Sequence, residues 1–447
     1  MITAIFDIGK TNKKFFLLDE NLNEIYKEYI QFEEVTDDDG FPCENLQEVV
    51  QWIENTFNRY TRDPTLKITH VNFSTYGASL VHLDENYNVV TPFYNYLKPL
   101  PEEFHEHFLS RYGNRESFAL STSSPYLGML NAGLQLYYLK YFKPALFSKI
   151  RYAVHFPQYL SSLFTQRLYS DYTSIGCHTG LWDFSNYRYA PWVKEEGLDQ
   201  LLCPVTSSTQ SVINHKIRFG VGIHDSSSAL IPYTFTSEEP FTLISTGTWS
   251  ICLNPFNASP LTKRELELDC LNFMDARGNS VKASRLFLGE HFSNTLNRLA
   301  HYFQVEKKNY QLLIWNNLYT DKRENKKALL FNHQLIQPER FGFENGADEN
   351  FSLFCTYDEA VYQLFDEITD IQIASLQLAI GETKVRNIYI DGGFSNSEVF
   401  THFLADKLPE FTIYAASSPI GSTLGAALVV NPSNVPDFHY TRLNVKH

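Results

Sequence analysis

Glycine, hydroxyl, amide and cationic side chains share one short segment near the start of the chain, Asp7-Ile8-Gly9-Lys10-Thr11-Asn12-Lys13-Lys14. Gly9 lets the backbone approach a phosphate, Thr11 and Asn12 add hydrogen-bond donors, and Lys14 can pair with phosphoryl oxygens. The carboxylate of Asp7 could hold a water of the Mg²⁺ ion that accompanies a nucleotide. The segment therefore predicts a phosphate-binding turn, and an ordinary hairpin turn is the alternative that it leaves open.

A second segment with the same chemistry lies in the other half of the chain, at Ser245-Thr246-Gly247-Thr248. Clusters of Ser, Thr and Gly are common in ordinary turns, so this segment alone indicates little. Two such turns in two lobes would face one another and hold a polyphosphate from both sides. We therefore interpret the two turns as a pair.

A third segment, Asp391-Gly392-Gly393-Phe394-Ser395-Asn396, joins the predicted strand 387–390 to a helix that begins at Glu398. A Gly-Gly junction lets a flat ring approach the backbone, and the start of a helix directs N–H groups at an anion. The GxGxxG pattern of dinucleotide sites and the GxxxxGK[ST] pattern of P-loops are both absent. The segment thus favours a nucleotide site of another kind.

A carboxylate that could act as a base lies in the fourth segment, Phe219-Gly220-Val221-Gly222-Ile223-His224-Asp225-Ser226. Asp225 follows a glycine-rich strand and stands at the start of a predicted helix, where it could accept a proton from a hydroxyl. Asp and Ser are also favoured as helix N-caps. From the motif alone, the N-cap is the preferred interpretation.

The elements that must position these residues repeat between the two halves of the chain. Short apolar strands flank both turns, at 3–6 and 15–18 and again at 241–244 and 249–253. Further strands are predicted at 68–74 and 80–83, and helical spacing of apolar residues predicts helices at 44–60, 133–142, 155–166, 285–303, 357–380 and 397–408. This pattern predicts a duplicated α/β fold with two lobes, residues 1–238 and 239–447, whose boundary lies near 235–240.

The composition excludes several classes of protein. The 447 residues carry a net charge of −14, which disfavours sequence-independent binding to nucleic acid. The N-terminus lacks the pattern of a signal peptide, and no run of apolar residues is long enough to span a membrane. The six cysteines are scattered without a CxxC pair, so we expect buried free thiols in a cytoplasmic protein.

Taken in order, these segments resemble the motifs of the FGGY carbohydrate kinases, which belong to the actin/hexokinase/Hsp70-like ATPase superfamily. The first turn is similar to the D-x-G-x-T-N pattern of L-fuculokinases, and the second is similar to the S-S-G-T-W-S pattern of L-rhamnulokinases. Ser74-Thr75-Tyr76-Gly77 resembles the family's sugar loop, and His224-Asp225-Ser226 resembles its H-D-T stretch. Gly392 to Asn396 and Gly421 to Gly425 resemble the adenosine motif and the start of the last helix.

The resemblance implies two ribonuclease-H-like lobes with an interlobe cleft that binds ATP with Mg²⁺, and a sugar held mainly by the N-terminal lobe. It makes Asp225 the catalytic base. The implied sugar contacts are Tyr76, Gly77, His224, Asp225 and Ser226. The implied nucleotide contacts are Asp7, Gly9, Lys10, Thr11, Asn12, Lys14, Gly247, Thr248, Gly392, Gly393 and Asn396, with Asp7 holding Mg²⁺ through water.

The chain departs from the family pattern after the sugar loop. Family members usually carry an Asp and an Arg there, whereas this chain has Tyr94-Asn95-Tyr96-Leu97-Lys98-Pro99. Lys98 could replace the Arg, although a solvated surface lysine is the preferred interpretation. Lys10 adds a positive charge to the first turn in place of a small residue. Tyr76 or Trp249 could pack on the methyl face of a deoxysugar, but core packing is the preferred role of each aromatic residue.

The leading hypothesis is an ATP-dependent kinase that phosphorylates the 1-hydroxyl of L-rhamnulose or L-fuculose. The alternatives are a kinase for another ketose or polyol, such as xylulose, ribulose or glycerol, and a non-catalytic sugar or nucleotide sensor with the same fold. Asp225 is present and no helix-turn-helix extension is visible, so the sensor is disfavoured. A homodimer is left open, and no membrane or nucleic-acid partner is expected.

Overall fold

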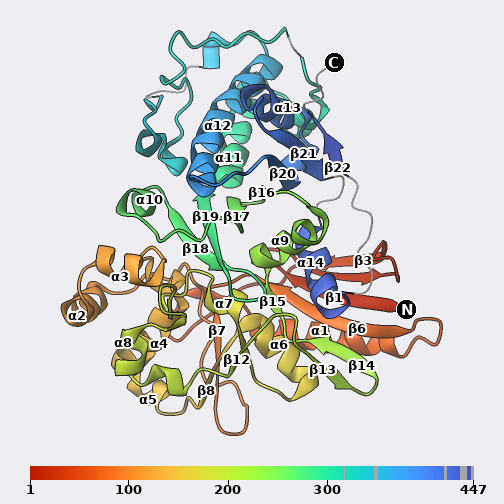
Figure 1. Cartoon of the computed structure of the whole chain (residues 1–447), viewed down its shortest axis with the longest axis vertical. Helices are drawn as coiled ribbons and strands as arrows, with labels where there is room; N and C mark the ends of the chain where they lie inside the picture. Colours follow the sequence, from red (N-terminus) through yellow and green to blue (C-terminus); the bar gives the residue numbers. More distant parts are fainter. Residues whose placement is uncertain (317, 347–350, 417–419, 433–439, 444–447) are drawn as a thin grey trace.

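Two mixed β-sheets, one from each half of the chain, organise the molecule (Figure 1). The structure is a computed structural model that describes residues 1–316, 318–346, 351–416, 420–432 and 440–443. The first half of the chain builds the lower part of Figure 1, and most of the second half builds the upper part. The predicted α/β fold with two lobes is confirmed.

The first sheet has the strand order β13-β14-β6-β1-β2-β3. β1 pairs antiparallel with β2 and parallel with β6, and the short β15 also pairs with β6 beyond β14. The strands are β1 (Ile2–Ile8), β2 (Lys13–Leu18), β3 (Glu24–Ile30), β6 (Ile68–Thr75), β13 (Ser211–Asn214), β14 (Ile217–Gly220) and β15 (Ile223–His224).

The second sheet has the order β18-β19-β17-β16-β20-β21-β22. β16 pairs antiparallel with β17 and parallel with β20, as β1 does with β2 and β6. This repeated arrangement confirms the predicted duplication. The strands are β16 (Phe241–Thr246), β17 (Ser250–Asn254), β18 (Cys270–Met274), β19 (Ser280–Leu286), β20 (Asn387–Gly392), β21 (Thr412–Ala416) and β22 (Tyr440–Arg442).

Helices cover both faces of the first sheet. α1 (Leu46–Thr61) and α6 (Phe156–Thr165) pack on one face, where Val49 and Ile53 of α1 share a core with Phe6 and Phe73 of the sheet. Asn45 caps α1 by accepting a hydrogen bond from the backbone N–H of Glu48. On the opposite face lie α9 (Asp225–Thr236) and α14 (Gly421–Val430), so the last helix of the chain returns to the first sheet.

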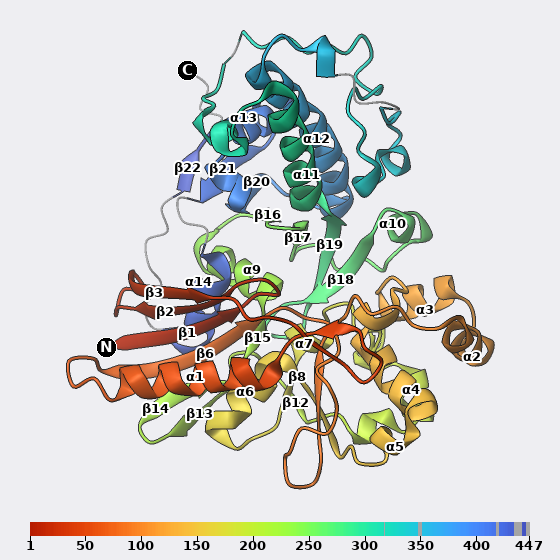
Figure 2. The same cartoon turned by 180° about the vertical axis from the view of Figure 1, so that it is seen from behind.

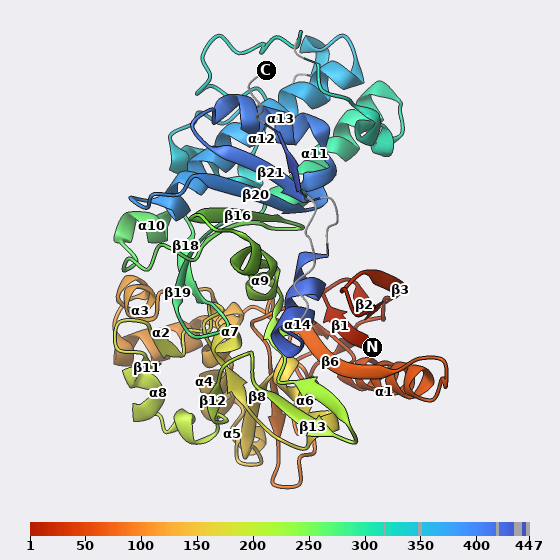
Figure 3. The same ribbon diagram turned by 45° about the vertical axis from the view of Figure 1, so that its right-hand side comes forward.

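The second sheet is covered on its outer face by α11 (Leu288–Phe303), α12 (Tyr357–Ile380) and α13 (Glu398–Lys407). On its inner face, Leu230 and Tyr233 of α9 share a core with Leu243 and Leu253 of the sheet. Helix α9 therefore packs on both sheets, and Figure 3 places α9 and α14 side by side between them. We call this region the junction.

Further helices in the first half build an aromatic core beside the first sheet: α2 (Glu102–Tyr112), α3 (Arg115–Thr122), α4 (Ala132–Phe142), α5 (Pro144–Phe147) and α8 (Pro191–Glu195). The short α7 (Tyr172–Ile175) packs in a separate small cluster with Trp182. The hairpin β18–β19 reaches this layer from the second sheet (Figure 2). There the N–H of Asn272 donates to the carbonyl of Ser123 at 3.0 Å, and Met274 packs with Ile175 and Trp182. The two lobes are thus joined by this hairpin as well as by α9 and α14.

The predicted helices at 44–60, 133–142, 155–166, 357–380 and 397–408 match observed helices to within two residues at each end. The helix predicted at 285–303 begins later, at Leu288, because Arg285 and Leu286 still belong to β19. Among the described residues, no helix has both the length and the apolar character needed to cross a membrane.

Candidate active site

The first predicted phosphate turn joins β1 to β2 and lies at the junction. The N–H of Gly9 donates to the carbonyl of Asn12 at 2.9 Å, which closes the turn. Thr11 and Asn12 are exposed at its tip, as a ligand-binding role would require. Asp7 is buried at the end of β1, and Nζ of Lys14 lies 3.4 Å from its Oδ2.

The side-chain ammonium group of Lys10 already has an ion-pair partner. Its Nζ pairs with Oε1 of Glu34 at 2.9 Å, and the amide of Asn12 accepts a hydrogen bond from Gln31 at 2.7 Å. The extra positive charge that the sequence places in the turn is therefore already neutralised, and Lys14 is the cation nearest to Asp7.

The second predicted turn joins β16 to β17 in the equivalent position of the second sheet. Gly247 and Thr248 are exposed, and the N–H of Gly247 donates to the carbonyl of Trp249 at 2.8 Å. The N-terminus of α11 supports the turn from behind, because the N–H groups of Gly289 and Glu290 donate to the carbonyl of Thr248 at 3.1 and 3.2 Å. No charged side chain belongs to this turn.

The Gly-Gly segment lies next to the second turn. Gly392 ends β20 with φ of 85°, and a Cβ there would lie 1.9 Å from the carbonyl oxygen of Thr246, so only glycine fits. The hydroxyl of Thr246 donates to the carbonyl of Asp391 at 2.6 Å and accepts from the N–H of Phe394 at 2.9 Å. Gly393 faces open space, and Asn396 is exposed nearby. The structure thus brings two of the predicted nucleotide segments together.

Asp225 lies at the junction as the first residue of α9, directly after β15. The N-cap alternative is wrong, since His224 occupies the cap position and the Asp225 carboxylate instead accepts from the N–H of Ser226 at 2.5 Å. The same oxygen, Oδ1, lies 3.2 Å from the Ser226 hydroxyl and 3.2 Å from Nε2 of His224. Oδ2 accepts no hydrogen bond from any residue that the structure describes.

The surroundings of Asp225 raise the pKa of its carboxyl to near neutrality. Burial raises its pKa to about 7, and the nearby charge of Asp7 adds to the rise, while Ser226 and Lys14 oppose it. The side chain nevertheless keeps 33% of its surface exposed, so a ligand can reach it. A carboxyl whose pKa lies near the working pH suits a general base.

The sugar loop lies beside His224. A Cβ at Gly77 would lie 2.4 Å from Sγ of Cys177 and 3.1 Å from Cδ2 of His224, so only glycine fits here. The ring of Tyr76 is buried in the core of the first sheet, and its hydroxyl donates to Glu44, which pairs with the buried Lys13. Tyr76 is therefore a core residue, as preferred above for the aromatic residues, and it packs beneath the sugar loop.

Helix α14 connects the two halves of the site, a role that the sequence did not predict. The hydroxyl of Ser422 donates to Oδ2 of Asp7 at 3.0 Å. A Cβ at Gly421 would lie 2.0 Å from Oδ2 of Asp391, whose pKa burial raises to about 6. The first turn of α14 therefore contacts one carboxylate from each sheet. The only signal in the sequence was the small residues at this helix start.

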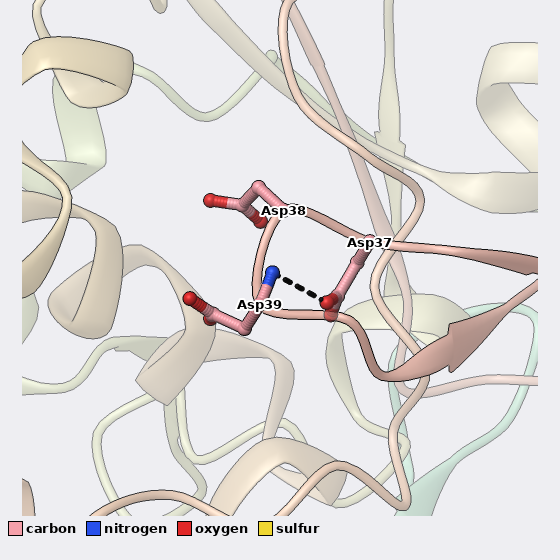
Figure 4. A group of neighbouring side chains, drawn as sticks. All are labelled: Asp37, Asp38 and Asp39. Atoms are coloured by element: carbon pink, nitrogen blue, oxygen red, sulfur yellow. Dashed lines mark hydrogen bonds between the residues drawn. The ribbon is translucent and has the colours of Figure 1, made fainter.

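Lys98 is buried, so its interpretation as a solvated surface lysine is wrong. Its Nζ lies 2.6 Å from Oδ2 of Asp37 and 2.6 Å from Oδ2 of Asp39, and 4.9 Å from the ring centre of Tyr94. Figure 4 shows the acidic turn, in which the N–H of Asp39 donates to Asp37 at 2.9 Å. The segment that departs from the family pattern therefore forms an internal ion-pair cluster.

Comparisons with known proteins point to one family. Residues 2–224 match the model of the N-terminal domain of the FGGY family of carbohydrate kinases. No curated protein sequence gives a match.

Solved structures share the whole fold. A carbohydrate kinase from Novosphingobium aromaticivorans has 22% identity and a TM-score of 0.77, over 99% of this chain and 93% of that one. Ligand-bound xylulose kinase from Lactobacillus acidophilus has 14% identity and a TM-score of 0.74, over 96% and 89%. Glycerol kinase from Plasmodium falciparum with ADP has 16% identity and a TM-score of 0.71, over 96% and 89%. Because residues 2–224 match the family model and the whole chain shares its fold with solved carbohydrate kinases, the chain belongs to the FGGY family of carbohydrate kinases.

Proposed function

We propose that this kinase transfers the γ-phosphoryl group of ATP to a terminal hydroxyl of a ketose, with Asp225 as the base. The observation that carries the proposal is the position of Asp225: it starts the helix that lies between the two sheets, beside the Asp7 turn, with one carboxylate oxygen held and the other open.

Asp225 Oδ2 would take the proton of the sugar hydroxyl as its oxygen bonds to the γ-phosphorus. The bond from that phosphorus to the bridging oxygen would break at the same time and leave ADP. Because such transfer depends on positioning and charge neutralisation, the two turns and Lys14 would supply most of the catalysis. His224, Ser226 and Gly77 would contact the sugar.

The nucleotide would lie between the two turns. In this proposal residues 239–447 form the nucleotide-binding lobe and residues 1–238 the sugar-binding lobe. Thr11, Asn12, Gly247 and Thr248 would face the phosphates. Gly393 and Asn396, which are exposed beside the second turn, would lie near the adenosine.

Asp7 has the chemistry that a Mg²⁺ site needs. Its Oδ2 accepts hydrogen bonds from Ser422 and Lys14, while Oδ1 accepts none from the described part of the chain. One open carboxylate oxygen suits Mg²⁺, which keeps several waters and binds mainly to the phosphates of its nucleotide. When bound, the ion would neutralise charge on the phosphoryl oxygens.

For the sugar we propose L-rhamnulose or L-fuculose, with the 1-hydroxyl as acceptor. The support is the motif similarity of both turns, together with Trp249, which is 37% exposed beside the second turn and could cover the methyl group of a deoxysugar. Other ketoses and polyols, such as xylulose, ribulose and glycerol, are the alternative. All six cysteines are free, which suits the reducing cytoplasm that we propose as the location.

A coupled assay of ADP release with a panel of ketoses and polyols tests the proposal. We expect strong stimulation by one of the two 6-deoxyketoses and weak stimulation by xylulose, ribulose and glycerol. Preference for one of the latter would overturn the choice of sugar but keep the reaction. No stimulation by any member, with ATP still bound, would favour the sensor.

A further inference from the structure

Arg285 of β19 is a buried cation that uses few of its hydrogen-bond donors. Its side chain is 5% exposed, and Nη2 donates to Oδ1 of Asp269 at 2.7 Å. Nε is buried, and neither Nε nor Nη1 donates to any residue that the structure describes. A buried donor without a partner has lost its hydrogen bonds to water without replacing them, so such groups are rare in folded proteins. The unused N–H groups of Arg285 are therefore available to an acceptor from outside the chain.

The side chain of Arg285 lies on the face of the second sheet that is turned toward the first lobe. Side chains alternate between the two faces of a strand, so Val281 and Ala283 share the face of Arg285. Both pack in one core with Cys177 of the first lobe, and Ile251, which is opposite Arg285 on β17, packs against the same core. The guanidinium is therefore on the side of the second sheet where Cys177 lies.

Cys177 belongs to the surroundings of the sugar loop. Its Sγ lies 3.0 Å from Nε2 of His224, and a Cβ at Gly77 would lie 2.4 Å from the same sulfur. Burial lowers the pKa of the adjacent His178 well below its usual value, and the nearby positive charge of Arg285 acts in the same direction. Arg285 is therefore close to the residues that pack behind the sugar loop.

Different charges act on the carboxylate of Asp225. Burial raises its pKa, the charge of Asp7 adds to the rise and Lys14 opposes it, and both of these charges belong to the first phosphate turn. For the Cys177 thiol, by contrast, burial raises the pKa and the charge of Arg285 opposes the rise. Arg285 thus lies on the side of the sugar loop away from the first phosphate turn.

Trp249 and Asp269 fix the orientation of the guanidinium. The guanidinium carbon lies 5.3 Å from the ring centre of Trp249, and this ring lies 4.7 Å from that of Phe287. The carboxylate of Asp269 neutralises the cation. The free N–H groups therefore suit uncharged oxygen acceptors, such as the hydroxyl groups of a sugar.

We propose that Arg285 is a sugar-binding residue contributed by the second lobe, whose guanidinium donates hydrogen bonds to hydroxyl groups that take no part in phosphoryl transfer. This role rests on the proposed function, since it needs a sugar at the loop of Gly77. The sugar would then contact both lobes, with Gly77 and His224 in the first and Arg285 in the second. Sugar binding would therefore favour closure of the lobes over the substrate.

Calorimetric titration with the panel of ketoses and polyols, in the absence of ATP, measures this contact independently of phosphoryl transfer. Arg285→Met keeps most of the length of the side chain but no donor, and we expect Kd for the preferred sugar to rise about 30- to 100-fold. Arg285→Lys keeps the charge with a different donor geometry and should give an intermediate loss. Kd for ADP should change by less than about threefold in both variants.

The outcomes separate the role of Arg285 from the proposed reaction. Unchanged sugar affinity in Arg285→Met would overturn the role, and so would a loss of ADP affinity without a loss of sugar affinity. A sugar that binds the wild-type protein but is not phosphorylated would overturn the kinase reaction, while the two variants would still decide the role of Arg285. Binding of no member of the panel would overturn both.

Lys282→Met is the matched control. Lys282 is a buried cation on the same strand, but its side chain lies on the opposite face, where Nζ pairs with Oε1 of Glu265 at 3.0 Å. We expect this variant to melt at a lower temperature than the wild type, because it leaves a carboxylate without its partner, and to keep Kd for the sugar within about twofold. Equal losses of sugar affinity in Lys282→Met and Arg285→Met would show a general effect of losing a buried cation and would overturn the contact.

A crystal structure of the wild-type protein with the bound sugar covers the case in which Arg285→Met does not fold. We expect a sugar oxygen within hydrogen-bond distance of the Arg285 guanidinium. A bound sugar that contacts only residues of the first lobe would overturn the proposed contact.

Discussion

The two turns that join β1 to β2 and β16 to β17 share a topology but differ in charge. The first turn includes Asp7 and Lys14, and every cation near it already pairs with a carboxylate. The second turn presents only backbone and hydroxyl groups, supported by the N-terminus of α11. The repeated β-hairpin therefore forms two turns of the same topology, but charged side chains belong only to the first turn.

The largest effect that would test this comparison concerns one carboxylate of each lobe. Asp225→Asn should lower kcat by at least about a thousandfold, because the amide cannot accept the proton, while ATP binding persists. The matched change Asp391→Asn, in the second lobe, should leave kcat within about tenfold. Steady-state kinetics and nucleotide titration measure both. Equal losses in the two variants would show that the base is misassigned.

A smaller difference is expected between the turns themselves. Lys14→Met removes the cation nearest to Asp7 and should lower kcat/KM for ATP by about 10- to 100-fold. Thr248→Ala removes one neutral hydroxyl and should lower kcat/KM for ATP by about threefold. The loss in the lysine variant should shrink as salt is added, because salt already screens this charge in the wild type. Similar losses at all salt concentrations would contradict the charge difference.

The pH dependence of kcat/KM should reflect the ionisation of Asp225 in the first lobe. Because the base must be ionised and the pKa of Asp225 is raised to about 7, kcat/KM for the sugar should rise about tenfold between pH 6 and pH 8. An acid limb near pH 4 would mean that this carboxyl is not the base.

The raised pKa of Asp225 also affects stability: activity should rise with pH, whereas the stability of the folded protein should fall. Between the ordinary value of 3.8 and about 7, the folded state keeps a proton that the unfolded chain releases, so this carboxyl lowers stability as pH rises. Asp225→Asn should therefore melt at a higher temperature than the wild type above pH 7, and the difference should vanish near pH 4.

The smallest effect concerns the glycines behind the uncharged turn. A Cβ at Gly289 would lie 1.9 Å from the carbonyl oxygen of Gly247, whereas a Cβ at Gly247 itself would meet nothing closer than 3.9 Å. Gly289→Ala should therefore displace the turn and raise KM for ATP by about three- to tenfold. A silent Gly289→Ala would mean that the N-terminus of α11 does not support the turn.

The sequence predicted the features that depend on local pattern. Apolar strands on either side of a Gly and Thr turn identified both hairpins, and helical spacing identified α12 to the residue. The sequence did not predict contacts between segments that are distant in the chain. Ser422 lies 415 positions from Asp7, and no local pattern indicates that the two residues are in contact. The burial of Lys98 was missed for the same reason, since the carboxylates that accept it lie about sixty residues earlier in the chain.

The contact between α9 and α14 has a mechanical consequence. A Cβ at Gly425 would lie 1.8 Å from the carbonyl oxygen of Ser228, so the two helices touch backbone to backbone. Because both helices also pack on the first sheet, the contact would keep Ser422 and Asp7 together if one sheet rotated against the other. The exposed ion pair between Lys263 of the second lobe and Glu116 of the first has no such support and would break more easily in that rotation.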